Sequence, residues 1–516
     1  MKSTLYKIFI LALIFTTSSC KKGYLETKPV DQLTDEEMFK NVTNTKAALN
    51  GIYRLFYQRL SGNDEDGHTS MMVVLDYLGE DVVFSARGTD TYYYTYRWQD
   101  HRSSENSLPL FAYRLYYRII DNANIILEKI DSVPDATDSD KQTIKGECLA
   151  LRAFGHFMLV QLFGKRYEAS LKDNYDTENL NSPNIALGVP IMTKHSLAPQ
   201  KRATVAAVYQ QINNDLDEAI VKLTGAPKRI YKTHIDKNVA LGLKARVCLT
   251  QQNYTDAISY AQQALQGYSL MSRTDYLSGF NNLQNDEWMW GVQIKEEQIT
   301  PSSGFFAFMA SNFNSIHTRT NPKMINKLIY NNIPLSDVRR RMWCDDVDDV
   351  ENFPGVIDGM TLKAVENQLR FRLMHNKFRV ANPVSRAGDV PLMRAAEMHL
   401  IIAESYQQMG TAYIENAKDA LYTLLINRDP EYTRDETTGN TFRDAVRAQR
   451  RIELWGEGFR FLDLKRQNIA LARGNKNTTG VNSVWANVTS VAVGSNSWQF
   501  KIPQREIEAT GMPQNP

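Results

Sequence analysis

Three stretches of the chain repeat hydrophobic residues at steps of three and four, the spacing of one face of an α-helix. The clearest runs from Val205 to Leu223, where Thr204 stands in position to cap the first turn. A similar face runs from Ile144 to Leu162 and stops before Gly164, and the residues from Tyr113 to Ile130 follow the same pattern. The pattern predicts core-facing amphipathic helices at all three places.

One helical stretch has the pattern of a hairpin. Residues 245–265 read ARVCLTQQNYTDAISYAQQAL, in which a first helix ends near Gln252, a turn follows, and Ala257, Ala261 and Ala264 line a second helix. Small residues at this spacing let two helices approach closely, and the stretch resembles a tetratricopeptide hairpin.

Further copies of this hairpin are predicted at two other places. Residues 396–427 carry Ala417, Ala420 and Leu424 in like positions, and residues 147–163 pair with 204–223 as a degenerate copy split by an insertion. Because such hairpins cannot bury their faces alone, we expect them to stack into one curved helical scaffold.

The segments between the helical blocks are rich in Gly, Asn, Ser, Pro and aromatic residues. We predict long irregular excursions there with few short strands, such as Trp288–Ile294, whose Trp288 and Trp290 should be core. Loops longer than about 15 residues usually carry function or are disordered, and the aromatic content argues against disorder.

The expected fold is a single, mostly α domain over 35–516. Its helical scaffold is predicted at 35–60, 110–164, 204–270 and 393–470. The irregular excursions are predicted at 61–109, 165–203, 271–392 and 471–516.

The N-terminus has the order of a bacterial export signal. Lys2 and Lys7 precede the apolar run IFILALIF, and small residues lead to Cys20. The run is too short to span a bilayer, which takes about 20 apolar residues. We therefore expect residues 1–19 to be a lipoprotein signal peptide that is removed, Cys20 to be acylated, and 20–34 to be a tether to the outer membrane. The usual leucine three positions before the cysteine is replaced by Thr17.

Composition narrows the function classes. The chain has 516 residues, 43% of them hydrophobic, with 60 basic and 58 acidic residues, so loss of Lys2 and Lys7 leaves a neutral protein. A neutral surface gives no electrostatic case for nucleic acid. After Cys20, the odd and widely spaced Cys148, Cys248 and Cys344 do not form a disulfide framework, and Cys148 and Cys248 are expected to be buried. No Cys/His spacing indicates a metal, and no cofactor is expected.

Seven phrases in this order resemble the SusD/RagB family along nearly the whole mature length. They are YLETKPVDQLTDEEMF with ALNGIY, ECLALRAFGHFMLVQLFG, RATVAAVYQQINNDLDEAI, ALGLKARVCLTQQNYTDAISYAQQAL, PLMRAAEMHLIIAESY, QRRIELWGEGFRFLDLKR and IPQREIEATGMPQNP. The resemblance implies one helical domain whose loops form a ligand site on one face. It also implies a lipid-anchored protein at the cell exterior that captures glycans or other nutrients for a SusC-like TonB-dependent transporter.

Candidate ligand residues are sought among loop aromatics, because a sugar ring offers an apolar face to a ring plane and hydroxyls to polar partners. The segment 87–106, RGTDTYYYTYRWQDHRSSEN, alternates aromatic residues and is expected to form a strand with these residues on one face. One face could equally be core. The predicted ligand contacts here are Tyr92, Tyr94, Tyr96 and Trp98, with Arg87, Asn106 and Asp81 as polar partners. Trp98 is the first choice.

A second candidate is GFFAFMASNFN at 304–314, where Phe305, Phe306 and Phe313 either plug into the scaffold or form a binding platform. The charged phrase at 450–466 is expected to be a helix pair connected by ion pairs four residues apart rather than a catalytic site. The acidic run 345–351 lacks the spacing of a calcium loop and is expected to be solvated.

No catalytic motif is present: there is no HExxH, GxSxG or phosphate-binding glycine loop. We therefore expect a binding protein and not an enzyme. Two alternatives stay open. One is a surface glycoside hydrolase or peptidase, because the two carboxylates of a glycosidase can be far apart in sequence. The other is a helical-repeat scaffold that binds only proteins.

Overall fold

The computed structural model describes 35–84, 91–167, 186–299, 303–313, 315, 317–318, 321–344, 373–382, 385–475, 479 and 486–516. The predicted signal peptide (1–19), Cys20 and the predicted tether (20–34) lie outside these residues, as does the acidic run 345–351. Most of the described chain is helical, which confirms the predicted fold class.

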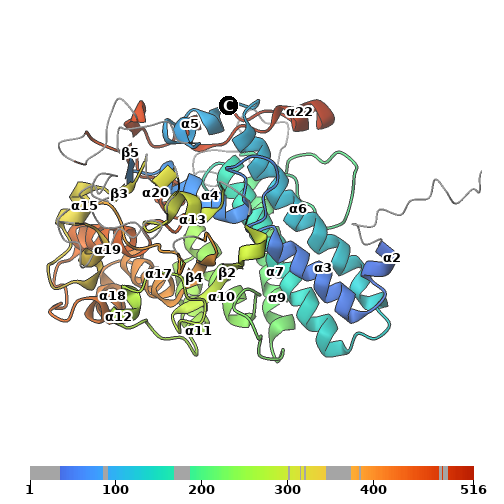
Figure 1. Cartoon of the computed structure of the whole chain (residues 1–516), viewed down its shortest axis with the longest axis horizontal. Coiled ribbons are helices and arrows are strands. Elements are labelled where there is room, and N and C mark those ends of the chain that lie inside the picture. The colour runs from blue at the N-terminus through green and yellow to red at the C-terminus, as the bar shows by residue number, and fades with distance from the viewer. Residues whose placement is uncertain are drawn as a thin grey trace, which may run out of the picture.

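A group of antiparallel helices forms one side of the molecule, at the right of Figure 1. The two longest are α6 (Ser107–Lys129) and α7 (Asp138–Phe163), preceded in the chain by α2 (Asp35–Met38) and α3 (Val42–Arg54) and followed by α9 (Val205–Leu223). The side chain of Thr204 caps α9, as predicted, by accepting from the backbone N–H of Ala207. The helix α7 packs along α9, which confirms the degenerate hairpin.

The other two predicted hairpins are also confirmed. They are α10 (Lys237–Thr250) with α11 (Tyr254–Ala264), and α17 (Ala395–Gln408) with α18 (Ile414–Arg428). The hairpins stack, since α10 contacts α9 and α11 contacts α17. They continue into α19 (Gly439–Glu453) and α20 (Arg460–Arg466).

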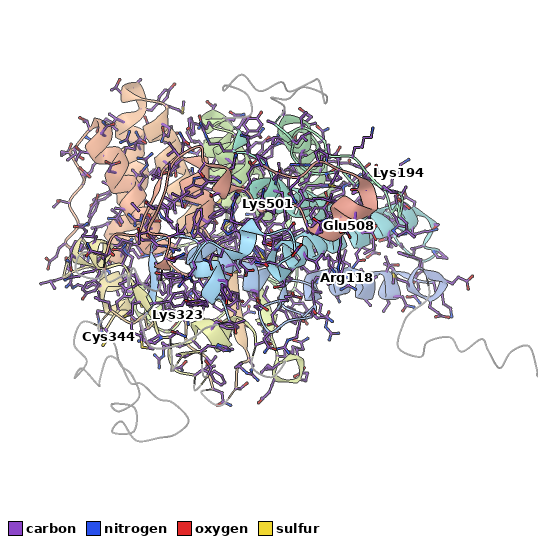
Figure 2. The ribbon with its side chains drawn as sticks, turned by 90° about the horizontal axis from the view of Figure 1, so that it is seen from above. Arg118, Lys194, Lys323, Cys344, Lys501 and Glu508 are labelled. Carbon is purple, nitrogen blue, oxygen red and sulfur yellow. The ribbon has the colours of Figure 1, made fainter. Side chains whose placement is uncertain are left out.

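The segment 61–109 is more regular than predicted, because it contains the helix α4 (Gly67–Tyr77), all of whose residues are buried. The remaining short helices are α5 (Tyr93–Tyr96), α12 (Arg273–Tyr276), α13 (Phe305–Met309), α15 (Lys327–Asn331) and α22 (Gln504–Thr510). In Figure 1, α5 and α22 lie along the upper edge, and Figure 2 views the molecule from that side with Glu508 of α22 labelled.

The strands of the described residues form three antiparallel pairs. They join β1 (Val82–Phe84) to β3 (Lys323–Ile325), β2 (Trp288–Ile294) to β4 (Gly388–Arg394), and β5 (Leu471–Ala472) to β6 (Ser490–Val491). Strand β2 has the predicted bounds, and both of its tryptophans are buried, as expected. Cys148, Cys248 and Cys344 are free and buried.

Candidate ligand-binding surface

Three loops that are far apart in sequence meet at the side chain of Tyr92. Its ring centroid lies 4.8 Å from that of Phe308 in α13, with the ring planes 70° apart. Its hydroxyl donates to the backbone carbonyl of Asp64 at 3.4 Å. The two aromatic segments singled out in the sequence, 87–106 and 304–314, are therefore adjacent in the folded chain.

The prediction that Tyr92 to Trp98 form a strand is wrong. Tyr93–Tyr96 is the helical turn α5, closed by a hydrogen bond from the backbone N–H of Tyr96 to the carbonyl of Tyr92 at 2.9 Å. Residues four apart share a face of a helix, so Tyr92 and Tyr96 are buried together while Tyr94 is exposed. The local preference of aromatic residues for strands is outweighed by this packing.

Tyr92, Tyr96 and Trp98 do not present a ring face to solvent, which corrects the expectation that they stack on a ligand. Tyr96 lies under the guanidinium group of Arg473, whose Cζ is 4.1 Å from the ring centroid. Trp98 is only 4% exposed, and its indole N–H donates to the carbonyl of Leu78 at 2.9 Å. These side chains form the core beneath the loop surface.

Tyr94 is the predicted aromatic residue of this segment that remains accessible, with 59% of its surface exposed. Its ring meets the half-buried Tyr93 at a centroid distance of 5.2 Å and an angle of 75°. The guanidinium group of Arg97 lies against the ring of Tyr93, with its Cζ atom 4.9 Å from the ring centroid. An exposed ring plane near a guanidinium group is a combination that can bind a sugar ring.

The predicted polar partners are differently placed. Asp81 is buried, and its carboxylate accepts two hydrogen bonds from the Arg451 guanidinium, at 2.9 and 2.6 Å. The Asn106 side chain is half-buried and donates to the carbonyl of Asp100 at 3.2 Å. Arg87 lies outside the described residues. Asp81 is therefore a structural ion-pair partner and not a free acceptor, which corrects that expectation.

In the second segment, the plug interpretation is confirmed for Phe305 and Phe306, which are each 1% exposed in α13. Their place in the core corrects the alternative that they form a binding platform. Phe313, after the helix, is half-buried, and the Cζ atom of Arg386 lies 5.7 Å from its ring centroid. Neither Arg97 nor Arg386 could be singled out from the sequence, because one arginine in a loop gives no spacing signal.

The buried carboxylate of Asp66 ties two of these loops together. It accepts hydrogen bonds from the hydroxyl of Ser303 at 3.0 Å and from the backbone N–H of Gly304 at 2.9 Å. Burial raises the pKa of Asp66 to about 6, although these bonds and the nearby Arg59 oppose the shift. The loop surface is thus a preformed arrangement. We use the name aromatic surface for two groups of loop residues: Tyr93, Tyr94 and Arg97 form the first, and Phe313 and Arg386 form the second.

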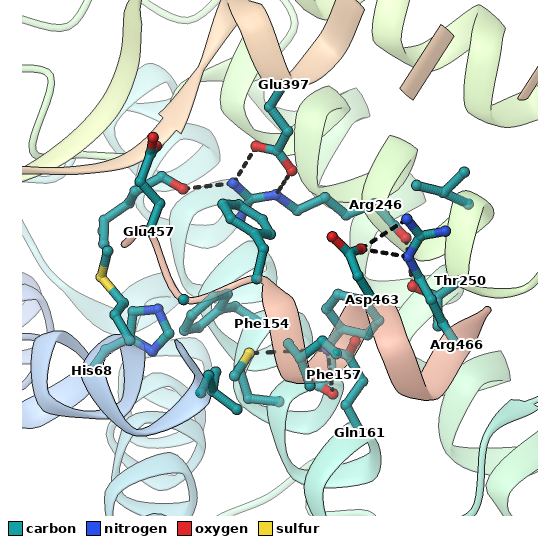
Figure 3. A pocket seen from close by; sticks show the side chains of 18 of the residues that line it. His68, Phe154, Phe157, Gln161, Arg246, Thr250, Glu397, Glu457, Asp463 and Arg466 are labelled. Atoms are coloured by element: carbon teal, nitrogen blue, oxygen red, sulfur yellow. Dashed lines mark hydrogen bonds and ion pairs between the residues drawn. The ribbon is translucent and has the colours of Figure 1, made fainter. Parts of the chain in front are cut away.

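A pocket of about 60 Å³ is lined by residues of α4, α7, α10, α17 and α20 (Figure 3). Its charged side chains are paired: Arg246 donates to both carboxylate oxygens of Glu397, at 2.7 and 2.6 Å. Ligand cavities usually measure about 300 to 1,000 Å³, so this one is too small for a sugar.

The charged phrase at 450–466 is structural, as predicted, but its pairing differs from the prediction. Its side chains are largely buried and reach other elements instead of residues four positions away. Arg451 pairs with Asp81, Arg460 with Glu80, and Arg450 donates to Asp463 at 2.7 Å. Burial demands such partners, because an unpaired interior charge is costly.

The described residues contain no group of three or more His, Cys, Asp or Glu side chains arranged to hold a metal ion. Within the same part of the chain, no helix is long and apolar enough to cross a bilayer.

Two family models match the chain. Residues 23–249 match a model described as "Starch-binding associating with outer membrane", and residues 346–516 match the SusD family model. The chain belongs to the SusD/RagB family. This confirms the resemblance found in the sequence.

Relatives of known sequence and structure cover nearly the whole chain. SusD-like protein P25 of Formosa agariphila is 22% identical over 90% of each chain. A SusD-like carbohydrate binding protein from Bacteroides vulgatus has a TM-score of 0.76 at 22% identity, covering 91% of this chain and 97% of that one. A laminarin-binding SusD-like protein has a TM-score of 0.65 at 20% identity, covering 92% and 99%. At these identities the structures establish the shared fold.

Proposed function

We propose that this SusD-family protein binds oligosaccharides at the cell exterior and passes them to a SusC-like TonB-dependent transporter. The observation that carries the proposal is the aromatic surface, where the exposed Tyr94 and the half-buried Phe313 each lie in a group with an arginine. Ring planes stack on sugar faces, and guanidinium groups donate to hydroxyls. The relatives described as carbohydrate binding and laminarin-binding support the same ligand class.

The test begins with a glycan array probed by soluble protein that lacks the signal peptide and Cys20. Calorimetry then compares Tyr94→Ala and Phe313→Ala with the wild type on the glycan that the array identifies. Loss of one stacking plane should weaken binding by about 5- to 150-fold, by analogy with the roughly 1 to 3 kcal/mol of base stacking.

Tyr231→Ala is the matched control, because Tyr231 is also 59% exposed but lies outside the aromatic surface. It should bind like the wild type. Unchanged binding by both test variants would contradict the assignment of the aromatic surface. Incubation with the same glycan and analysis for shortened products separates binding from hydrolysis, and product formation would favour an enzyme.

We infer that Cys20 anchors the protein in the outer membrane. The basic start, the apolar run of eight residues and the small residues before Cys20 support this inference. Several acyl chains give durable attachment, because each buried methylene contributes about 0.8 kcal/mol. Cys20→Ser should release folded protein from the membrane fraction. Continued sedimentation of that variant with outer membranes would contradict the anchor.

A further inference from the structure

A separate groove of about 520 Å³ lies between α6, the segment 190–200 and α22. Its volume falls within the range of about 300 to 1,000 Å³ that is usual for ligand sites. Figure 2 looks onto this side of the molecule and labels Arg118 of α6 and Glu508 of α22. Among the residues that line the groove are Tyr113, Arg114, Tyr117, Arg118, Leu197 and Glu506.

The walls of this groove are tied together by buried hydrogen bonds. Arg202, which is 4% exposed, donates to the carbonyls of Gly188 at 2.8 Å and Pro513 at 3.0 Å, and to the amide oxygen of Asn515 at 2.7 Å. These bonds connect the loop wall with the C-terminal segment. The hydroxyl of Tyr117 joins α6 to the same loop by donating to the Pro190 carbonyl at 2.8 Å. The groove is therefore preformed, which lowers the entropic cost of binding.

Two arginines on one wall form no ion pair with any other residue that the structure describes. Arg114 and Arg118 are one helical turn apart, so they lie on the same face of α6, and both are exposed. Within the described part of the chain, neither forms a hydrogen bond or an ion pair. Each offers a planar set of donors suited to a carboxylate or a sulfate.

Within the described residues, no carboxylate near the groove forms an ion pair with either arginine. Asp121 pairs with the imidazole Nδ1 of His195 at 2.8 Å. Glu506, which also lines the groove, forms no ion pair with either arginine in the part of the chain that the structure describes. The buried Glu65 is close enough to Arg114 for their charges to interact, but the two form no ion pair within the described residues. The wall formed by α6 thus presents two guanidinium groups that form no ion pair with any described residue.

The floor beside the arginines is aromatic. The rings of Tyr113 and Tyr117 lie with their centroids 4.5 Å apart and their planes at 46°. Across the groove, the side chain of Leu197 is 93% exposed. An apolar floor next to unpaired guanidinium groups suits a ligand that has both a ring face and a negative charge.

We infer that this groove binds an acidic sugar residue, either a uronate or a sulfate ester. The inference rests on the proposed function, since it assumes that the ligand is a carbohydrate, and it adds the charge of the ligand and a second place of contact. Arg114 and Arg118 would hold the anionic group, while the sugar ring would lie against Tyr117.

The test is calorimetry of the soluble protein with trigalacturonate and with its methyl ester, which has the same rings without the charges. A second arm compares galactose 6-sulfate with galactose and so distinguishes the two sources of negative charge. We expect the anionic member of at least one pair to bind and its neutral counterpart to bind at least about tenfold more weakly. Arg114→Gln with Arg118→Gln should remove this preference, and Arg118→Lys should retain part of it.

Arg505→Gln is the matched control, because Arg505 is an exposed cation on α22 that does not line the groove. It should leave the affinity unchanged. Equal binding of the charged and neutral probes, or no binding of either, overturns the inference. So does equal weakening by Arg505→Gln and the double variant. In that case, a neutral glycan that still binds to the Arg114→Gln, Arg118→Gln double variant but fails to bind to Tyr94→Ala would support the proposed function, while the inference about the groove fails.

Discussion

The indole of Trp98 is enclosed by parts of the chain that are distant in sequence. Its N–H donates to the Leu78 carbonyl, and its ring meets Trp498 edge-on at 5.0 Å and Phe461 at 5.8 Å. Replacing a buried tryptophan by alanine leaves a cavity and costs about 3 to 5 kcal/mol. We therefore expect Trp98→Ala to lower the free energy of unfolding by about this amount, measured by denaturant titration.

Tyr94→Ala serves as the comparison, since its side chain is largely exposed. It should change the free energy of unfolding by no more than about 0.5 kcal/mol. A Trp98→Ala protein as stable as the wild type but deficient in glycan binding would restore Trp98 as a ligand residue and contradict the packing argument.

Asp76 in α4 gives a pH-dependent prediction. Burial raises its pKa to about 8, although the backbone N–H of Gly458 donates to its carboxylate at 2.7 Å. Between about pH 4 and pH 8 the unfolded chain has released this proton while the folded protein keeps it, so the stability contribution falls as the pH rises. Asp76→Asn retains an acceptor for Gly458 and cannot ionise. The variant should therefore gain at least about 1 kcal/mol relative to the wild type between pH 5 and pH 7.5.

Urea titrations of the wild type and Asp76→Asn at pH 5 and pH 7.5 measure this difference. All other titrating groups are the same in both proteins, so their contributions cancel when the two are compared. If the difference in the free energy of unfolding between the wild type and Asp76→Asn is the same at both pH values, the pKa of Asp76 is not raised in the folded protein.

At the scale of elements, the hairpin of α10 and α11 depends on small residues at the helix contact. Ala257, Ala261 and Ala264 have no exposed surface. A leucine at position 261 would overpack this contact and cost about 1 to 3 kcal/mol. Ala261→Leu should lower the melting temperature without selectively changing ligand affinity.

The neighbouring Gln262 is exposed and supplies a control with the same new side chain. Gln262→Leu should melt close to the wild type. If the two leucine variants melt alike, the small side chain at position 261 is not needed for packing of the hairpin.

Several of the helices that could be predicted from sequence have one buried and one exposed face, although α7, which is also predicted, is buried on all sides from Gly146 onward. The helix α9 has this pattern, and so do the second helices of the hairpins. By contrast, α4 is buried on all sides, so GHTSMMVVLDY has no polar face and gives no helical periodicity. The family's motifs span the chain and predict the fold even where the periodicity does not.

For the candidate site, the sequence predicted which loops take part but not which of their side chains are exposed. The segments 87–106 and 304–314 do meet, but which of their aromatic rings face solvent depends on distant residues. Arg473 covers Tyr96, and Trp498 covers Trp98. These partners lie near the C-terminus of the chain, and no local pattern at 87–106 encodes them.

At the scale of the whole molecule, a cluster of buried charges joins the β2–β4 pair to the last helices. Arg394 at the end of β4 donates to Glu453 at 3.0 Å and to Glu457 at 2.6 and 2.9 Å, and it also pairs with Glu287. Arg428 at the end of α18 binds Glu287 at 2.7 Å and Glu453 at 3.1 Å. Because these residues have almost no exposed surface, the cluster fixes how the hairpins sit against the strands.

The ionised state of the cluster follows from its balance of charge. Burial alone would raise the pKa of Glu453, but the guanidinium groups of Arg428, Arg394 and Arg339 hold it below its ordinary value. The carboxylate therefore stays charged and depends on these partners. Removing one partner leaves buried charge without compensation, which typically costs about 3 to 5 kcal/mol.

We accordingly expect Arg394→Met to destabilise the protein by about 3 to 5 kcal/mol, because it removes one cation and leaves the carboxylates of Glu287, Glu453 and Glu457 with fewer donors. Denaturant titration gives the change, and Arg434→Met is the control. Arg434 also pairs with several carboxylates, but they are exposed to solvent, where ion pairs contribute little. A loss from Arg394→Met no greater than that from Arg434→Met would mean that methionine packing replaces the buried ion pairs, and that the cluster does not hold the scaffold to the strands.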